Sequence, residues 1–156
     1  MTEFTHLDAT GAARMVDVSG KDVSVRTATA RGQVRVSAAV IELLRNGGLP
    51  KGDALAVARI AGIMAAKRTP DLVPLCHPIA IHGVTVDLAV TDTEVAIEAT
   101  VRTADRTGVE MEALTSVVVA GLALVDMVKA VDPAAVITEV CVVSKTGGAT
   151  GDWSRP

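Results

Sequence analysis

The chain has 156 residues and a formal net charge of −3, with 49% hydrophobic but only 1% aromatic residues. This length suits one domain with an aliphatic core. The acidic balance and the lack of aromatic side chains argue against nucleic-acid binding, because phosphate backbones attract basic surfaces and single strands stack on aromatic rings.

Targeting and cysteine signals are weak. Cys76 and Cys141 lie far apart in the sequence, which gives neither a disulfide framework nor a zinc-ligand spacing. The first residues contain no charged region followed by an apolar one, so we expect no signal peptide. The most apolar run, residues 117–125, is too short to span a membrane. We therefore expect a cytoplasmic protein that binds neither nucleic acid nor membranes.

The first half of the chain predicts an irregular arm, a strand and two helices. Residues 1–20 show no periodicity and are expected to form the irregular arm. Apolar alternation places the strand at 23–37, and helical periodicity places the helices at 38–46 and 54–68. Asp53 can cap the second helix, and Pro70 is expected to end it. The apolar face expected for this helix consists of Leu55, Ala58, Ile60 and Ile63.

The second half predicts a hairpin, a long helix and a last strand. The two hairpin strands are expected at 79–90 and 94–104, with their turn at 91–93. The long helix is expected at 108–131 and the last strand at 136–145. Pro133 is expected to stop the helix. The apolar face expected for this long helix consists of Met111, Leu114, Val118, Leu122, Val125 and Val128.

This element order predicts an α+β fold, a ferredoxin-like antiparallel sheet with helices on one face in split βαβ order. Alternate positions in 84–90 and 95–101 are rather apolar, so we expect the other sheet face to be buried against another subunit. We expect one catalytic domain over 21–148, preceded by the arm and followed by a flexible tail over 149–156.

Residues 70–79, "PDLVPLCHPI", place a cysteine beside a histidine between prolines. The side chains of a nucleophile and its base, or of two metal ligands, must point towards the same place. Side chains of neighbouring residues in an extended chain point to opposite sides instead. We therefore expect Cys76 to be a small buried hydrophobe. His77 is either bonded to the backbone or a donor to an anionic ligand.

Charged residues form the remaining candidates. Glu110 and Glu112 open the long helix on opposite sides, where acids suit the helix dipole, so one can face a site. Asp126 and Lys129 are three positions apart and can pair, as a surface ion pair or in a site. Lys145 precedes a Gly-rich segment that is either a phosphate cradle or merely flexible. Other basic residues are scattered along the chain: Lys21, Arg26, Lys51, Arg59, Lys67 and Arg68.

Five blocks together resemble the MoaC family of cyclic pyranopterin monophosphate synthases over about residues 5–152. They are "HLDATGAARMVDVSGK", "LPKGDALAVARIAGIMAAKRTPDLVPLCHPI", "TGVEMEALT", "DMVKAV" and "KTGG". Ala149 departs from the pattern, because family members often carry a lysine there. The resemblance implies a ferredoxin-like subunit in a homohexamer, a trimer of dimers.

The resemblance also implies a lyase of molybdenum cofactor biosynthesis. Its substrate would be (8S)-3′,8-cyclo-7,8-dihydroguanosine 5′-triphosphate, made by a radical-SAM partner enzyme, and its products cyclic pyranopterin monophosphate and pyrophosphate. The rearrangement needs general acids and bases and cations for the leaving pyrophosphate. It requires no redox cofactor and no protein metal site, although Mg²⁺ can accompany the substrate phosphates.

The resemblance assigns roles to individual residues. The catalytic positions are Lys51, Asp126 and Lys129, and the substrate-binding positions are Leu75, Cys76, His77, Met111, Glu112, Lys21, Arg26 and Lys145. About 21 Å of helix axis separates Glu112 from Asp126, so a site that uses both is expected between subunits. A ligand-sensing or oligomerisation module, and a lyase acting on another nucleotide or pterin, are the alternatives.

Overall fold

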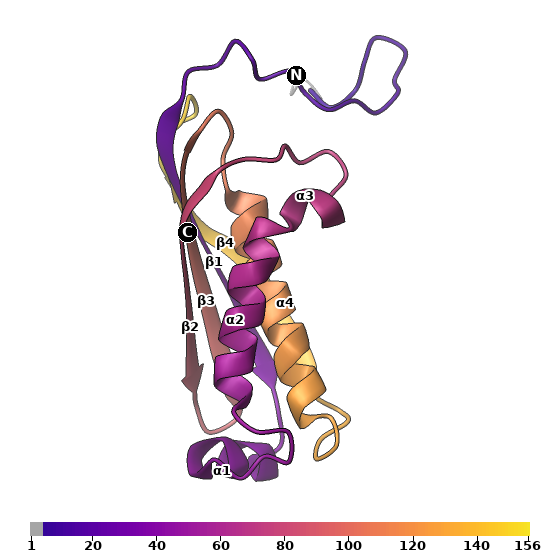
Figure 1. Ribbon diagram of the computed structural model, residues 1–156, viewed down its shortest axis with the longest axis vertical. Coiled ribbons are helices and arrows are strands. Elements are labelled where there is room, and N and C mark those ends of the chain that lie inside the picture. Colours follow the sequence, from indigo (N-terminus) through magenta and orange to yellow (C-terminus); the bar gives the residue numbers. More distant parts are fainter. Residues whose placement is uncertain (1–4) are drawn as a thin grey trace.

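The computed structural model describes residues 5–156, which fold into one antiparallel sheet with helices on one face (Figure 1). The elements are β1 Ser24–Arg35, α1 Ala38–Asn46, α2 Ala54–Lys67, α3 Thr69–Leu72, β2 Ile81–Val90, β3 Glu94–Asp105, α4 Glu110–Val128, β4 Val136–Thr146 and β5 Trp153–Ser154. The strand order is β2-β3-β1-β4-β5. This confirms the predicted α+β class and is consistent with a ferredoxin-like plan.

Side-chain caps begin the two helices that follow β1. The Ser37 hydroxyl accepts a hydrogen bond from Val40 N at 3.4 Å, and the Asp53 carboxylate accepts one from Ala56 N at 3.0 Å. Gly47 ends α1 in the left-handed conformation with φ of 71°, which glycine adopts without steric cost. The predicted cap at Asp53 is therefore confirmed.

The prediction that Pro70 ends α2 is wrong. Helix α2 ends at Lys67, and Pro70 lies in the first turn of the short helix α3, where its missing N–H is not needed. The Thr69 hydroxyl donates to the carbonyls of Ala65 and Ala66, which helps to turn the chain from α2 into α3.

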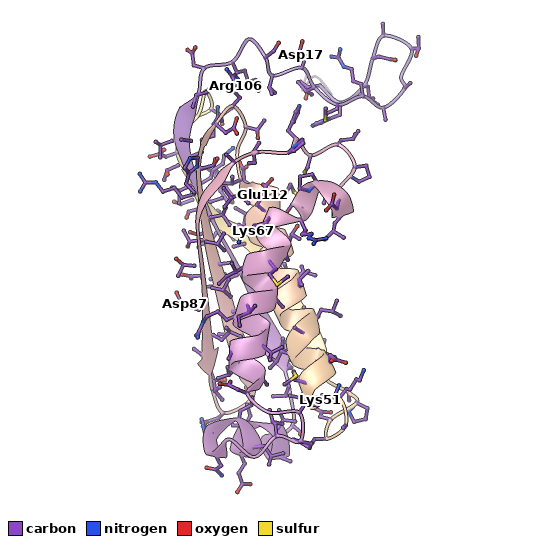
Figure 2. The ribbon with its side chains drawn as sticks, in the orientation of Figure 1. Asp17, Lys51, Lys67, Asp87, Arg106 and Glu112 are labelled. Atoms are coloured by element: carbon purple, nitrogen blue, oxygen red, sulfur yellow. The ribbon has the colours of Figure 1, made fainter. Side chains whose placement is uncertain are left out.

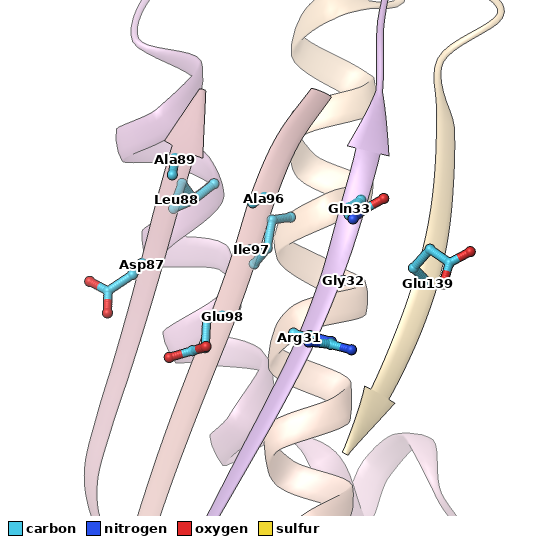
Figure 3. A pocket seen from close by; sticks show the side chains of 10 residues that line it. All are labelled: Arg31, Gly32, Gln33, Asp87, Leu88, Ala89, Ala96, Ile97, Glu98 and Glu139. Atoms are coloured by element: carbon cyan, nitrogen blue, oxygen red, sulfur yellow. The ribbon is translucent and has the colours of Figure 1, made fainter. Parts of the chain in front are cut away.

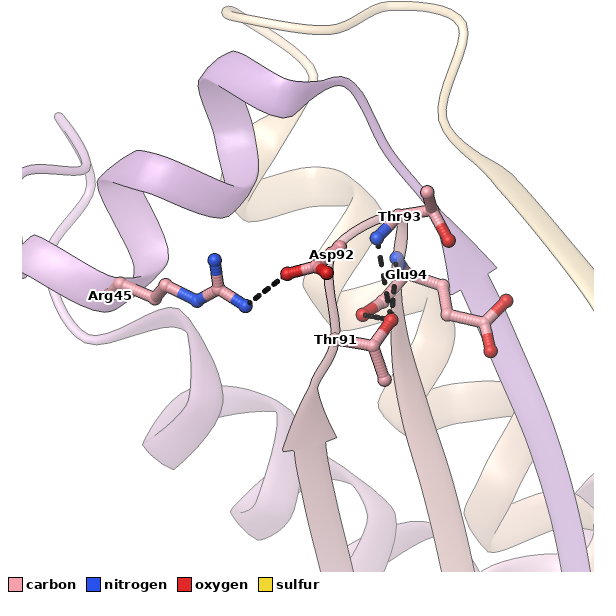
Figure 4. Close-up of polar contacts among 5 residues, drawn as sticks. All are labelled: Arg45, Thr91, Asp92, Thr93 and Glu94. Atoms are coloured by element: carbon pink, nitrogen blue, oxygen red, sulfur yellow. Dashed lines mark hydrogen bonds and ion pairs between the residues drawn. The ribbon is translucent and has the colours of Figure 1, made fainter.

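The hairpin between β2 and β3 is confirmed, with residues 91–93 as its connection (Figure 4). Thr91 N donates to Glu94 O at 2.8 Å, and the Thr91 hydroxyl accepts from Glu94 N at 3.2 Å. Arg45 of α1 pairs with Asp92 at 2.9 Å, so this exposed ion pair links α1 to the hairpin tip.

The core lies between the sheet and the helices α2 and α4, and small side chains line much of it. An added Cβ at Gly62 of α2 would lie 3.0 Å from Ser116 O and 3.2 Å from Ala120 Cβ of α4, so the two helices pack closely. The residues of α4 on the buried side include Ala113, Val117, Ala120, Leu124 and Val128.

The predicted apolar faces of α2 and α4 are wrong in part. Ile60 of α2 and three residues of the face predicted for α4, Met111, Val118 and Leu122, are exposed, whereas Ala58 and Val128 are buried as expected. Both helices are apolar on more than one side, and the small residues take the core side because they let the helices approach each other.

Helix α4 also meets the length and hydropathy criteria for a membrane-spanning helix, the one helix of residues 5–156 to do so. Half of that segment is buried within the fold, where α4 packs between α2 and the sheet. Such burial is typical of the core helix of a globular domain.

The prediction of an apolar outer sheet face is wrong. The apolar residues of β2 and β3, such as Val86 and Ile97, face the helices, and Asp87 and Glu98 face outward (Figure 3). An open cavity of about 580 Å³ lies on this face, lined in part by Arg31 and Glu139. It contains none of the predicted site residues.

Both ends of the chain add structure to the predicted domain. In the segment 149–156, predicted as a flexible tail, β5 pairs with β4, and Arg155 N donates to Val143 O at 2.7 Å. The arm forms an isolated bridge between Leu7 and Ala13, and Asp8 accepts hydrogen bonds from Thr10 and Ala12. The first four residues of the predicted arm lie outside the described residues.

Candidate active site

Three predicted catalytic residues meet at one end of the helix layer. Lys51 Nζ lies 3.2 Å from Asp126 Oδ2 and 3.0 Å from Asp126 O, and Lys129 Nζ lies 2.7 Å from Asp126 Oδ1. The pair predicted from the spacing of Asp126 and Lys129 is confirmed. We call these three residues the lysine–aspartate cluster.

Two different parts of the chain build the lysine–aspartate cluster. Lys51 lies in the turn before the Asp53 cap of α2. Asp126 lies in the last turn of α4, and Lys129 is the residue that caps its C-terminal end. Hydrogen bonds from Lys129 and then Lys51 lower the pKa of Asp126. The aspartate is therefore ionised at neutral pH and pairs with both lysine side chains.

A second group of predicted residues lines a cavity of about 360 Å³ at the other end of α4. Its lining includes Leu75, Cys76, His77, Met111 and Glu112, together with Lys21 and part of the arm. We call it the histidine cavity. Its lining combines apolar residues with charged and hydrogen-bonding ones, a mixture typical of small-molecule sites.

His77 is bonded to the backbone and also lines the histidine cavity. Its Nε2 contacts the carbonyl oxygen of Val16, so the arm is tied to the proline-rich loop. The alternative that His77 is bonded to the backbone is therefore confirmed, and His77 is also one of the residues that line the histidine cavity.

Cys76 and His77 do not point to opposite sides, as extended chain would require. Cys76 N donates to Val73 O at 3.1 Å, so residues 73–76 form a turn and both side chains line the histidine cavity. Burial, together with the charge of Glu112, raises the pKa of the Cys76 thiol. Cys76 is only half-buried, so the prediction that it is a buried hydrophobe is wrong in part, and it remains a thiol at neutral pH.

Glu112 is the buried acid of the histidine cavity, only 3% exposed. Burial raises its pKa to about 6, and the nearby charge of Glu110 contributes to this rise. A carboxyl group with a pKa near neutrality can either give or take a proton at physiological pH, which is the property of a general acid or base.

A third group, the anion cavity, adjoins the histidine cavity. It has a volume of about 190 Å³, shares Lys21 and Gly108 with the histidine cavity, and is also lined by Arg26 and Lys145. Gly148 has φ of 84°, and an added Cβ there would lie 2.4 Å from Arg26 Nη1. The Gly-rich segment therefore lets the backbone approach the guanidinium group closely.

The structure brings the predicted residues together in two places, not one. The histidine and anion cavities adjoin, whereas Lys51 and Glu112 lie towards opposite ends of the helix layer (Figure 2). The separation of about 21 Å expected between Glu112 and Asp126 thus persists in the fold, since both lie on one continuous helix.

Two charged residues in or near the cavities, Glu110 and Arg106, have no assigned role from the sequence. Glu110 lines the anion cavity and pairs with Lys145. Arg106 donates from Nε to Lys21 O at 3.0 Å and so holds the end of the arm. The acidic pair at the helix start had suggested that one glutamate faces a site, whereas no sequence signal indicated the contact from Arg106.

No group of three or more histidine, cysteine, aspartate or glutamate side chains within residues 5–156 is arranged to hold a metal ion. The polar groups of the two cavities and the lysine–aspartate cluster are mainly cationic. They suit an anionic organic ligand with proton-exchanging groups.

Comparisons with known proteins agree with this chemistry. A family model described as the MoaC family matches residues 15–148. A cyclic pyranopterin monophosphate synthase from Nocardioides sp. is 70% identical over 98% of this chain and 96% of its own length. One from Streptomyces avermitilis is 70% identical over 97% and 89%. Cyclic pyranopterin monophosphate synthase 2 from Mycobacterium tuberculosis is 59% identical over 98% and 92%.

Proposed function

The chain belongs to the MoaC family, and on that premise we propose that it is a cyclic pyranopterin monophosphate synthase. The enzyme is a lyase of molybdenum cofactor biosynthesis. It converts (8S)-3′,8-cyclo-7,8-dihydroguanosine 5′-triphosphate, supplied by a radical-SAM enzyme, into cyclic pyranopterin monophosphate and pyrophosphate.

The lysine–aspartate cluster is the observation that carries this proposal. The reaction opens and closes rings and therefore moves several protons, which requires donors and acceptors within hydrogen-bond reach of the substrate. Lys51 and Lys129 are held on one ionised carboxylate at 3.2 and 2.7 Å. A substrate atom that replaces Asp126 as the partner of either lysine would accept a hydrogen bond from an ammonium group that is already in position.

The adjoining cavities support binding of a nucleotide triphosphate. In this proposal the base lies in the histidine cavity against Leu75, Met111 and Glu112, and His77 donates to it. The phosphates lie in the anion cavity beside Arg26 and Lys145. These cations stabilise the charge that develops on the departing pyrophosphate, and Mg²⁺ would arrive with the phosphates.

A complete site then requires two subunits. The surface of α2 and α4 between the two ends carries exposed apolar side chains, which favour burial against a partner: Val57, Ile60, Met64, Val118 and Leu122. A second copy that packs on this surface in antiparallel orientation would bring its lysine–aspartate cluster to the cavities of the first. Three such dimers would form the hexamer.

The direct test supplies purified protein with the cyclised triphosphate and measures pyrophosphate and the fluorescence of the oxidised pterin. We expect turnover by the native chain and a fall of about a hundredfold or more for Lys51→Ala, as for loss of a general acid or base. Arg31→Ala is the control, because Arg31 is an exposed cation on the outer face of the sheet, away from the helix layer. Tight binding without turnover by the native chain would instead support a ligand-binding module.

A further inference from the structure

The anion cavity contains one acidic side chain among its cations. Lys21, Arg26 and Lys145 line it, and so does Glu110, the first residue of α4. An acid is unexpected in a cavity that receives phosphates, because like charges at short range repel each other. Nothing in the proposed reaction assigns a role to Glu110.

Contacts hold the Glu110 carboxylate inside this cavity. Its Oε1 lies 3.2 Å from Lys145 Nζ. The side chain folds back over Gly108, since an added Cβ at Gly108 would lie only 2.1 Å from Glu110 Oε2. The positive end of the α4 dipole also favours an acid at this position. The carboxylate therefore occupies space beside Lys145 that is otherwise open to a ligand.

The Glu110 side chain is also able to move away from Lys145. The side chains of Glu110 and Lys145 are 30% and 31% exposed, so solvent reaches both. Lys145 has a second contact, to the Thr150 hydroxyl at 3.3 Å, which keeps the ammonium group in place when Glu110 moves. A partly exposed ion pair contributes little free energy, so a phosphate group with a higher charge can replace it.

We propose that Glu110 is a displaceable internal anion, which fills the phosphate position beside Lys145 in the empty enzyme and returns there as pyrophosphate leaves. This inference rests on the proposed function, because that function makes the cavity a phosphate site. Glu110 forms no bond to the substrate. It acts by competing with the product for Lys145, which lowers the affinity for pyrophosphate and speeds its release.

The test measures binding of inorganic pyrophosphate alone by isothermal titration calorimetry, with no substrate present. We expect Glu110→Gln to bind pyrophosphate about three- to tenfold more tightly than the native chain, because one partly exposed negative charge is removed while the shape of the side chain is kept. Lys145→Ala should bind more weakly. Glu42→Gln is the charge-matched control, since Glu42 is exposed on α1 at the opposite end of the molecule.

Equal or weaker binding by Glu110→Gln overturns the proposal, as does a Glu42→Gln variant that gains as much affinity. Glu110→Ala provides a second variant, and circular dichroism shows whether each variant is folded. Failure of the proposed function is distinct from this result. If Glu110→Gln binds pyrophosphate more tightly but the native chain never turns over the cyclised triphosphate, the internal anion is supported and only the proposed reaction is overturned.

Discussion

At the scale of single residues, the acids of the site differ in charge state because their surroundings differ. Asp126 is exposed, and hydrogen bonds from Lys129 and Lys51 lower its pKa. Glu112 is buried, and burial raises its pKa to about 6. One acid is therefore an anion that holds two lysines, and the other exchanges its proton near neutral pH.

Glu112 also carries a cost in stability. A raised pKa means that the folded state binds the proton more tightly than the unfolded state. As pH rises from about 4.5 through about 6, the unfolded chain loses its proton first and the folded state loses stability. Above pH 6 the buried carboxylate remains charged, and this cost reaches its full value.

The first prediction concerns this cost. Glu112→Gln should leave stability nearly unchanged at pH 4.5 and raise the free energy of unfolding by about 2 kcal/mol at pH 7.5, relative to the native chain. Urea denaturation at fixed protein concentration across this pH range measures the difference. Glu98→Gln, at an exposed strand position, is the control. A difference that does not grow with pH would contradict the role of burial.

At the scale of elements, the start of α2 connects helix formation to the site. The Asp53 carboxylate satisfies Ala56 N, an amide that the first helical turn leaves without a helical partner. Lys51 lies two residues before this cap and reaches Asp126 at the end of α4. A well-formed first turn therefore fixes the direction from which Lys51 approaches the lysine–aspartate cluster.

The second prediction tests this cap. Asp53→Ala should lower the free energy of unfolding by about 1 kcal/mol, because one amide loses its acceptor, whereas Asp53→Asn should retain most of the stability. Urea denaturation compares the three chains. Turnover of the cyclised triphosphate should also fall more in the alanine variant than in the asparagine variant. Equal stability of the alanine and asparagine variants would count against capping.

At the scale of the whole molecule, the candidate site residues lie at the two ends of the helix layer, with an apolar surface between them. The lysine–aspartate cluster lies at one end, and the histidine and anion cavities lie at the other (Figure 2). Leu122 is 59% exposed and Ile60 58% exposed on the surface between them. An antiparallel pair of subunits would cover this surface and complete two sites at once.

The third prediction concerns the apolar surface. Leu122→Glu should dissociate the oligomer, because a charge placed in an apolar contact loses its hydration. Analytical ultracentrifugation should show a smaller species, and the far-ultraviolet circular dichroism should stay native. Val136→Glu is the matched control, since Val136 is also exposed but lies at the start of β4. An unchanged oligomer would exclude the helix layer as the interface.

The fourth prediction concerns the shared site. Asp126→Ala and Glu112→Ala should each be inactive alone, and a mixture that has exchanged subunits should recover part of the native turnover. Recovery is expected because one of the hybrid sites carries native residues from both chains. Subunit exchange is verified first with differently tagged chains. Exchanged mixtures that stay inactive would place both residues in one subunit's own site.

The sequence by itself determined the elements and the local pairings. Alternation and helical periodicity located β1 to β4 and the helices α1, α2 and α4 to within a few residues, since these patterns follow directly from backbone geometry, but they gave no signal for the short elements α3 and β5. The spacing of Asp126 and Lys129 predicted their ion pair, and Asp53 predicted a cap. Such features depend on residues close in the chain, so no knowledge of the fold is needed.

Only the tertiary structure decided which apolar face is buried and which charged groups meet. Helix α4 is apolar on several sides, and its core side became clear only because Ala120 and Ser116 pack against Gly62. Lys51 reaches Asp126, and Glu110 reaches Lys145, across segments far apart in the sequence. Packing of whole elements sets these contacts, and no local pattern contains that information.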